Sequence, residues 1–371
     1  MHGITNFPAR LWFSKVSAPA FCTTPFLRVT RDYKPESILE TFAPELTEKL
    51  PAPYKLTPQI MASNPYDFVR IAQWFLRFTD EVELNCGCPS PTVFGNGAGS
   101  SLLAETDKFH DFIATIVNEI GPDKLSVKMR TGIVDTDDFS SLVQSLNDLA
   151  LKRLVVHGRT RSAGYTGRSD WQLIEQARKL SKHPVRGSGD INSWLQVKDL
   201  KGENIIGRGA LRNPWIFGEI AAQKTVRFNP EVLKWSIGVW LALHFASSTD
   251  RKFLIDLAPT VLEFPVCFAD ELKWEELYFQ LTEAIWGVAM VPQDLEVERF
   301  SMGFLKMMWN YLRSGLPRVY FQADLFKAKN PGDFFKILDQ LAKKNPSLEM
   351  DHKADFDWVY AGRGQDPVHG I

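Results

Sequence analysis

Two cysteines lie beside a glycine-rich segment in a pattern that suits a catalytic thiol. Residues 83–103 read Glu-Leu-Asn-Cys-Gly-Cys-Pro-Ser, then Pro-Thr-Val-Phe-Gly-Asn-Gly-Ala-Gly-Ser-Ser-Leu-Leu. An apolar strand end therefore runs directly into Cys86, Cys88 and Pro89. Loops at strand ends carry chemistry because the strand fixes the residue while the loop leaves its side chain free to reach a ligand. The segment predicts that one of these thiols takes part in catalysis.

A metal site is the alternative for the two cysteines. Structural zinc usually takes two pairs of Cys or His ligands, and the cysteines at 22, 86, 88 and 267 supply no second pair. We therefore expect no metal. The uneven spacing, in a chain long enough to build a core without covalent staples, also predicts reduced thiols.

Two glycine-containing turns could hold a phosphate. Gly187-Ser188-Gly189-Asp190 and Gly207-Arg208-Gly209 follow two consecutive predicted strands. Glycine lets backbone N–H groups approach an anion closely, and Arg208 can donate two parallel hydrogen bonds to a phosphate. Ordinary tight turns are the alternative. Together with their placement, the turns predict a phosphate-bearing cofactor.

Lys128 and His157 also lie at predicted strand ends, in Val-Lys-Met-Arg and Val-Val-His-Gly-Arg-Thr. A lysine there can stabilise negative charge on a reduced flavin, or its head can reach solvent over a packed stem. A histidine beside glycine can bind a ligand or make a structural hydrogen bond. Their coincidence with the other strand ends favours ligand contacts.

The charge balance argues against nonspecific coating of nucleic acid. The formal net charge is −1, whereas such coating needs a basic excess. A local basic rim remains compatible with this value, and six solvated surface arginines are an equally good interpretation of the same residues. These arginines follow predicted strand ends: Arg130, Arg159, Arg161, Arg168, Arg208 and Arg212.

Strands and helices alternate up to about residue 223. Residues with three- and four-residue apolar spacing, such as Phe68, Ile71, Ala72 and Phe75, separate the strands and predict amphipathic helices. The candidate strands are Lys15–Ala18, Ser37–Phe42, Thr57–Met61, Glu81–Asn85, Leu125–Met129, Arg153–His157, Pro184–Gly187 and Asn204–Ile206.

This alternation predicts an α/β fold, a (β/α)₈ TIM barrel, followed by a C-terminal α-helical domain. Such barrels carry their active sites at the carboxyl ends of the strands. We expect a barrel domain over 1–223, a helical domain over 224–346 and a loosely ordered tail over 347–371. The apolar run Ser236–Ser247 is shorter than the roughly 20 residues that cross a bilayer. No secretory signal opens the chain, so we expect a cytoplasmic protein with no membrane association.

Seven motifs in fixed order resemble those of the tRNA-dihydrouridine synthase family, and the bacterial C-type branch most of all. The resemblance continues with Asn-Pro-Trp-Ile-Phe at 213–217 and a helix around Lys306. The seven motifs are Ser-Ala-Pro-Ala at 17–20, Pro-Gln-Ile at 58–60, Leu-Asn-Cys-Gly-Cys-Pro-Ser at 84–90, Val-Lys-Met-Arg at 127–130, Val-Val-His-Gly-Arg-Thr at 155–160, Gly-Asp-Ile at 189–191 and Ile-Gly-Arg-Gly-Ala-Leu at 206–211.

The resemblance implies an FMN enzyme that reduces the C5–C6 double bond of a uridine, in the D-loop of tRNA, with NADPH. It makes Cys88 the catalytic acid and assigns Asn85, Arg130 and Arg159 to substrate binding. If strand geometry continues through Cys86, its side chain points elsewhere, so we expect it to have a packing role. We expect a monomer whose C-terminal helices bind tRNA. The cofactor-binding residues would be Pro19, Ala20, Phe21, Gln59, Lys128, His157, Ser188, Gly189, Asp190, Gly207 and Arg208.

Some positions depart from the family pattern. Ala20 and Phe21 stand where the family has Met-Glu or a similar pair after Ala-Pro, Ser188 replaces a common asparagine, and the stretch before Ile206 is short. Residues 233–290 have no recognised counterpart. Two rival functions therefore stay open: a flavin-free, catalytically silent tRNA-binding homologue, and a flavin reductase of a small molecule.

Overall fold

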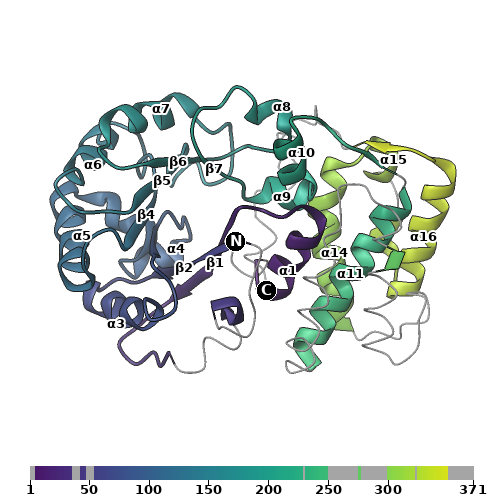
Figure 1. Cartoon of the computed structure of the whole chain (residues 1–371), viewed down its shortest axis with the longest axis horizontal. Coiled ribbons are helices and arrows are strands. Elements are labelled where there is room, and N and C mark those ends of the chain that lie inside the picture. Colours follow the sequence, from purple (N-terminus) through teal and green to yellow (C-terminus); the bar gives the residue numbers. More distant parts are fainter. Residues whose placement is uncertain are drawn as a thin grey trace.

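The computed structural model of the chain describes residues 5–35, 42–46, 54–228, 230–249, 275–276, 299–321 and 324–349. Figure 1 shows a curled sheet with its helices in one part of the molecule and a group of helices in the other, with α1 between them.

A parallel sheet carries the first part of the chain. Its seven strands lie in sequence order, and each pairs in parallel with the next. Helices follow most strands and cover the outside of the curl (Figure 1). The strands are β1 (Phe21–Arg28), β2 (Lys55–Met61), β3 (Val82–Cys86), β4 (Leu125–Arg130), β5 (Arg153–His157), β6 (Val185–Ser188) and β7 (Asn204–Ile205).

The outer helices form where the sequence supplies caps and an apolar stripe. The Asn64 side chain accepts from the backbone N–H groups of Tyr66 and Asp67 at the start of α3 (Pro65–Phe75), and Asp170 caps α7 (Trp171–Leu180) in the same way. Their apolar faces pack on the outside of the strands in one core. The remaining helices of this part are α4 (Pro91–Gly95), the 3₁₀ segments η1 (Pro44–Leu46) and η2 (Gly99–Ala104), α5 (Thr106–Ile120), α6 (Phe139–Ser145) and α8 (Trp194–Val197).

The α/β class, the curled parallel sheet and the helices that follow it are confirmed, but the expected first strand is wrong. Residues Lys15–Ser17 end helix α1 (Phe7–Ser17), whose N-terminus is capped by Asn6. A short apolar run does not by itself distinguish a strand from a buried helix. The other strands that fall on described residues are found within two residues of their expected bounds.

The first strand of the sheet, β1, was not expected. It contains Pro25, which cannot donate to a sheet ladder, and its register with β2 shifts between Thr23 and Phe26. The expected strand Ser37–Phe42 lies mostly outside the described residues, and β1 pairs directly with β2. In the described part of the chain the sheet therefore has seven strands rather than eight, with β1 and β7 at its ends.

A second core unites the helical part with the N-terminal helix. Trp12 of α1 packs edge-to-face on Trp240 and donates its indole N–H to the Ser236 carbonyl, 2.8 Å away. The elements of this part are α9 (Arg208–Arg212), α10 (Ile216–Ala222), α11 (Pro230–Thr249), α14 (Arg299–Leu312), η4 (Arg313–Gly315), α15 (Arg318–Phe321), η5 (Asp324–Lys327), α16 (Pro331–Lys344) and the antiparallel pair β8 (Arg227–Phe228) and β9 (Leu348–Glu349).

The expected tail at 347–371 lies outside the described residues from 350 onward, as does much of 233–290. Across the ranges given above, the helices are all too short or too polar to span a membrane. The boundary near residue 223 stays a prediction.

Candidate active site

A cavity opens among the carboxyl ends of the strands. Its volume is about 1060 Å³, slightly above the roughly 300–1,000 Å³ of small-molecule sites. Arg159, expected to bind substrate, is not among the lining residues. All the other expected site residues line the cavity: Pro19, Ala20, Phe21, Gln59, Asn85, Cys88, Lys128, Arg130, His157, Ser188, Gly189, Asp190, Gly207 and Arg208.

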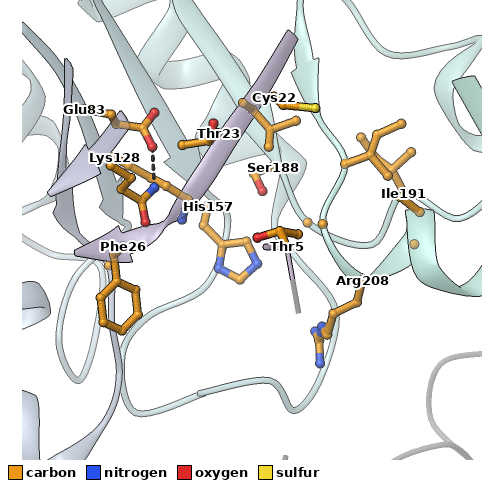
Figure 2. A pocket seen from close by; sticks show the side chains of 18 of the residues that line it. Thr5, Cys22, Thr23, Phe26, Glu83, Lys128, His157, Ser188, Ile191 and Arg208 are labelled. Carbon is orange, nitrogen blue, oxygen red and sulfur yellow. Dashed lines mark hydrogen bonds between the residues drawn. The ribbon is translucent and has the colours of Figure 1, made fainter. Parts of the chain in front are cut away.

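Strand register brings the polar residues together. Asn85 pairs with Lys128 across β3 and β4, and Arg130 pairs with His157 across β4 and β5. His157 in turn pairs with Ser188 of β6. Alternate residues of a strand share a face, so these side chains lie on the inner side of the curl. Figure 2 shows His157 between Lys128 and Arg208 in the cavity.

Cys88 lies just beyond β3 and contacts the cavity. It is 8% exposed and packs with Val93 and Ala98. Burial raises the pKa of its thiol, although a backbone hydrogen bond from Ser90 and the charge of Arg130 oppose the shift. The thiol therefore stays protonated at neutral pH, as a proton donor must.

Cys86 occupies a different environment. It is fully buried in the core between the sheet and its outer helices and does not line the cavity. Burial raises the pKa of this thiol strongly as well. Of the two cysteines, Cys88 is therefore the one that can reach a ligand.

A buried chain of hydrogen bonds fixes the Cys88 loop. The side-chain oxygen of Asn85 accepts from the backbone N–H groups of Gly87 and Cys88, at 3.0 and 3.1 Å. The Asn85 amide donates to Gln59 over 2.7 Å, and Gln59 donates to Glu83 over 2.5 Å. Glu83 anchors the chain, because its carboxylate oxygens can only accept when ionised.

Arg130 fastens the same loop from the other side. Its guanidinium donates to the carbonyl oxygens of Gly87, Thr160 and Gly164 at 2.7, 2.7 and 2.8 Å. These bonds tie the Cys88 loop to the segment after β5. Burial lowers the pKa of Arg130 to about 10, so the side chain remains a cation at neutral pH.

Arg159 supports the site without lining it. It is 3% exposed, and its Nη2 donates to both carboxylate oxygens of Asp190 at 2.8 Å. It also donates to the carbonyl oxygens of Thr166 and Gly167. Arg159 therefore holds the Asp190 turn against the segment after β5, and direct substrate contact stays an unsupported expectation.

The cavity is electropositive around Lys128 and His157. Burial lowers the pKa of Lys128, while the nearby Glu83 charge opposes this shift. Burial also lowers the pKa of His157 well below its usual value, and Arg130, Lys128, Arg159 and Arg208 reinforce the effect. His157 is thus neutral among cations, and the surrounding field suits an anionic ligand.

Two glycines shape the turns near Arg208. Gly189 has φ 127°, and a Cβ there would lie 2.2 Å from Ser169 Oγ. A Cβ on Gly209 would lie 1.7 Å from the Ile191 carbonyl oxygen, so only glycine lets α9 approach the β6 turn. The Arg208 guanidinium lies over the Tyr165 ring, 4.2 Å from its centroid.

These groups fit a flavin that carries a phosphate. Gln59 and Lys128 offer buried polar groups, and a Cβ on Gly207 would meet only open space. Pro19, Ala20 and Phe21 lie at the start of β1 rather than after its carboxyl end, because β1 begins later than the expected strand. All three line the cavity, and the guanidinium of Arg186 lies 3.8 Å from the centroid of the Phe21 ring.

The sequence alone did not identify Glu83 and Tyr165 as site residues. Glu83 lies two positions before Asn85 on the same strand face, so strand periodicity could have placed it inside. Tyr165 contacts the guanidinium groups of both Arg130 and Arg208, and no sequence signal predicts that contact. A cluster of side chains able to hold a metal ion is not found in the described part of the chain.

The chain is similar in sequence to several known enzymes. The chain is 29% identical over 252 residues to the tRNA-dihydrouridine(16) synthase of Escherichia coli K12, covering 63% of this chain and 76% of that protein. It is 26% identical over 264 residues to the Pasteurella multocida enzyme of the same name, covering 68% and 82%. The old yellow enzyme homologue of Zymomonas mobilis is 12% identical, with a TM-score of 0.44 over 59% of this chain and 85% of that one, a likeness too weak to carry an argument.

The profile of the family described as Dihydrouridine synthase (Dus) matches residues 1–251, which is more than half of the chain. The resemblance in the motifs is therefore confirmed, and the chain belongs to the dihydrouridine synthase family of oxidoreductases.

Proposed function

We propose that this protein reduces the C5–C6 double bond of a uridine in the D-loop of tRNA, with FMN bound in the cavity and NADPH as the reductant. The family supports the reaction class. Position 16 is the first candidate, because the bacterial relatives carry that position in their names. The observation that carries the proposal is the protonated Cys88 thiol, held at the wall of an electropositive cavity.

Residues at the carboxyl ends of the strands would hold the cofactor. Lys128 and Gln59 would contact the flavin ring, while Gly207 and Arg208 would bind the phosphate. Backbone groups of Ser188, Gly189 and Asp190 would complete the site, with His157 as a neutral donor or acceptor. Bound flavin supplies the hydride that C6 of the uracil receives.

Cys88 would supply the proton that C5 must receive. The raised pKa keeps the thiol protonated, and its fixed backbone holds the sulfur in one place. Donation leaves a thiolate, which the neighbouring cations Arg130 and Lys128 stabilise. Solvent then returns the proton before the next turnover.

Asn85 and Arg130 would orient the uracil in two ways: by contacting it in the cavity and by holding the Cys88 loop in place. Both line the cavity, and both hold the Cys88 loop. The second amide hydrogen of Asn85 can donate to an exocyclic uracil oxygen. The target base must leave its stack to reach the cavity, as in other enzymes that act on nucleobases.

The two rival functions predict different results. A flavin-free tRNA-binding homologue would purify without a yellow chromophore, whereas a small-molecule reductase would carry flavin yet leave tRNA unchanged. The fit of Lys128, Gly207 and Arg208 to a phosphate-bearing flavin speaks against the first rival.

The test combines three measurements on the purified full chain. The bound chromophore is released and identified, tRNA lacking dihydrouridine is incubated with NADPH or NADH, and dihydrouridine is mapped along the product. We expect FMN, preference for NADPH and one modified D-loop position. Protein with no flavin, or flavoprotein that leaves tRNA unmodified, would refute the proposal.

A further inference from the structure

Three arginines at the end of β4 and in the segment after β5 differ in what their guanidinium groups bind. Arg130 donates to three carbonyl oxygens, and Arg159 is paired with Asp190. Arg161 makes no side-chain hydrogen bond and no ion pair with any residue that the structure describes. Its Nε is buried without a hydrogen-bond partner. Of these three arginines, Arg161 is therefore the one whose N–H groups remain able to bind a ligand.

The position of Arg161 is fixed despite this lack of polar partners. Its guanidinium carbon lies 3.8 Å from the centroid of the Phe94 ring, a cation–π contact. Its backbone N–H donates to the Gly132 carbonyl over 2.9 Å, and the next residue, Ser162, donates to Ile133 over 2.8 Å. A planar guanidinium held over a ring loses little further freedom on binding, and its two terminal nitrogens can still donate to a phosphate.

This pair of side chains lies beside the proton donor. Phe94 belongs to α4, next to Val93, which packs against Cys88 and lines the cavity. Neither Arg161 nor Phe94 lines the cavity itself. The guanidinium therefore lies outside the cavity lining, beside the helix α4 that carries the cavity residue Val93.

The charges around Arg161 are mixed. Asp135, Asp137 and Asp138 follow the Gly132 turn that its backbone contacts, and in the described ranges none of them is within ion-pair distance of its guanidinium. The cavity-lining cations Arg130 and Arg208 both lie over the ring of Tyr165, four residues along the chain from Arg161. An anion that bridges from the cavity to Arg161 would thus meet positive charge along its path.

We propose that Arg161, held over the Phe94 ring, binds a backbone phosphate of the RNA strand that carries the target uridine. This inference rests on the proposed function and adds a specific contact to it. Phosphate contacts fix the register of a nucleic acid on a protein. A phosphate held beside the Cys88 loop would therefore set which uridine can swing into the cavity.

The test compares Arg161→Ala with a matched control. Arg77 also lies over a phenylalanine ring, 5.6 Å from the centroid of Phe78. It follows the C-terminal end of α3, near the amino ends of the strands and so away from the cavity. Arg77→Ala therefore removes the same charge and the same kind of contact far from the cavity. Binding of tRNA and dihydrouridine formation are measured over a series of salt concentrations for both variants.

We expect Arg161→Ala to weaken tRNA binding about tenfold at low salt, the loss of one charge-assisted contact. The slope of log affinity against log salt should shrink by roughly 0.7–0.9, the value for one phosphate. KM for tRNA should rise while kcat and flavin content stay near wild type. Arg77→Ala should leave all five quantities unchanged.

Two further variants separate binding from folding. Arg161→Lys keeps the charge without the planar fork and should recover part of the affinity, while Phe94→Leu should reproduce part of the loss because the guanidinium loses its platform. Unchanged affinity and slope in Arg161→Ala would overturn the inference, as would equal losses of flavin in the Ala and Lys variants. Wild-type protein that does not modify tRNA would instead refute the proposed function.

Discussion

The inner face of the sheet and the helical core bury their side chains equally well but with opposite chemistry. Glu83, Asn85 and Arg130 are each at most 6% exposed on the inner face of the sheet. In the helical core, Trp12, Trp240 and Trp309 are fully buried. Burying a polar group lowers stability unless the group is hydrogen-bonded, whereas burying an apolar side chain raises stability. The difference indicates that the inner face of the sheet is shaped by its ligands and the helical core by packing.

Several buried polar groups of the inner face bond to one another. Below the cavity, Glu81 accepts from Arg153 over 2.8 Å and from the Ser126 hydroxyl. Nearer the cavity, Glu83, Gln59 and Asn85 form one hydrogen-bonded chain. Substitutions there should therefore change chemistry or ligand binding, and substitutions in the helical core should change the free energy of unfolding.

The largest effect is expected at Cys88. Cys88→Ala should keep its flavin and still be reduced by NADPH, because reduction of the flavin does not use the thiol. Dihydrouridine formation should fall by about 10²–10⁴-fold, the usual cost of losing a general acid. Single-turnover reduction of tRNA by pre-reduced enzyme measures this step.

Cys86→Ala is the control, since this thiol is fully buried away from the cavity. It should cost stability rather than proton transfer. For the wild type, the rate should hold constant through neutral pH and fall only at alkaline pH, because the acid works while protonated and its pKa is raised. Equal rate losses in the two variants would show that the proton donor is wrongly assigned.

The next effect concerns the core that α1 shares with the helical part. Trp12→Ala removes a fully buried indole and its bond to the Ser236 carbonyl. It should lower the free energy of unfolding by about 3–5 kcal/mol, the usual cost of truncating a buried aromatic. Urea denaturation followed by circular dichroism measures the change.

Tyr66→Ala is the comparison for Trp12→Ala, because Tyr66 is 63% exposed. It should change the free energy of unfolding by less than about 0.5 kcal/mol. If Trp12→Ala were equally mild, α1 would not be part of the helical core. The shared core also means that removing all residues after 223 would expose the apolar face of α1, so truncation is a poor test of RNA binding.

Much of the sheet could be predicted because its strands are apolar runs bounded by turns. The strands β3, β4 and β5 lie within a residue of expectation, and a parallel order then places their ends together. The N-terminal helix could not be recognised, because Lys15–Ala18 has no periodicity to distinguish helix from strand. The strand β1 could not be recognised either, because Pro25 within it argues against a strand.

The residue types of the site were predictable, whereas some of their roles were not. Cys88 follows a strand, so its position could be inferred from the chain itself. Arg159 was expected to bind substrate, yet it pairs with Asp190, 31 residues away. Contacts of that separation depend on how strand ends meet, and a single sequence does not encode them as a local pattern.

A moderate loss of folding stability at acid pH should come from His244 in the helical core. Burial lowers the pKa of His244 from 6.5 to about 4, so the folded state keeps this imidazole neutral while the unfolded state gains a proton. Stability is therefore complete above pH 6.5 and falls as the pH drops toward 4, by at most about 3 kcal/mol.

Urea denaturation of the wild type and of His244→Phe at several pH values tests this expectation. His157 also has a lowered pKa and adds to the acid loss in both proteins. The variant should therefore show a shallower decline between pH 6.5 and 4, whatever its stability at neutral pH. Parallel curves would place the acid sensitivity in the site around His157 instead.

The smallest effect is expected at Arg208, whose guanidinium lies over Tyr165 at the cavity wall. If this side chain binds the phosphate of the cofactor, Arg208→Ala loses charge-assisted hydrogen bonds, and flavin should dissociate about tenfold more readily. Arg168→Ala is the control, because Arg168 is exposed on the same rim but does not line the cavity. Dialysis against flavin-free buffer, followed by absorbance, compares retention. Equal retention by the two variants would move the phosphate away from α9 and leave the polar turn of Ser188–Asp190 as its site.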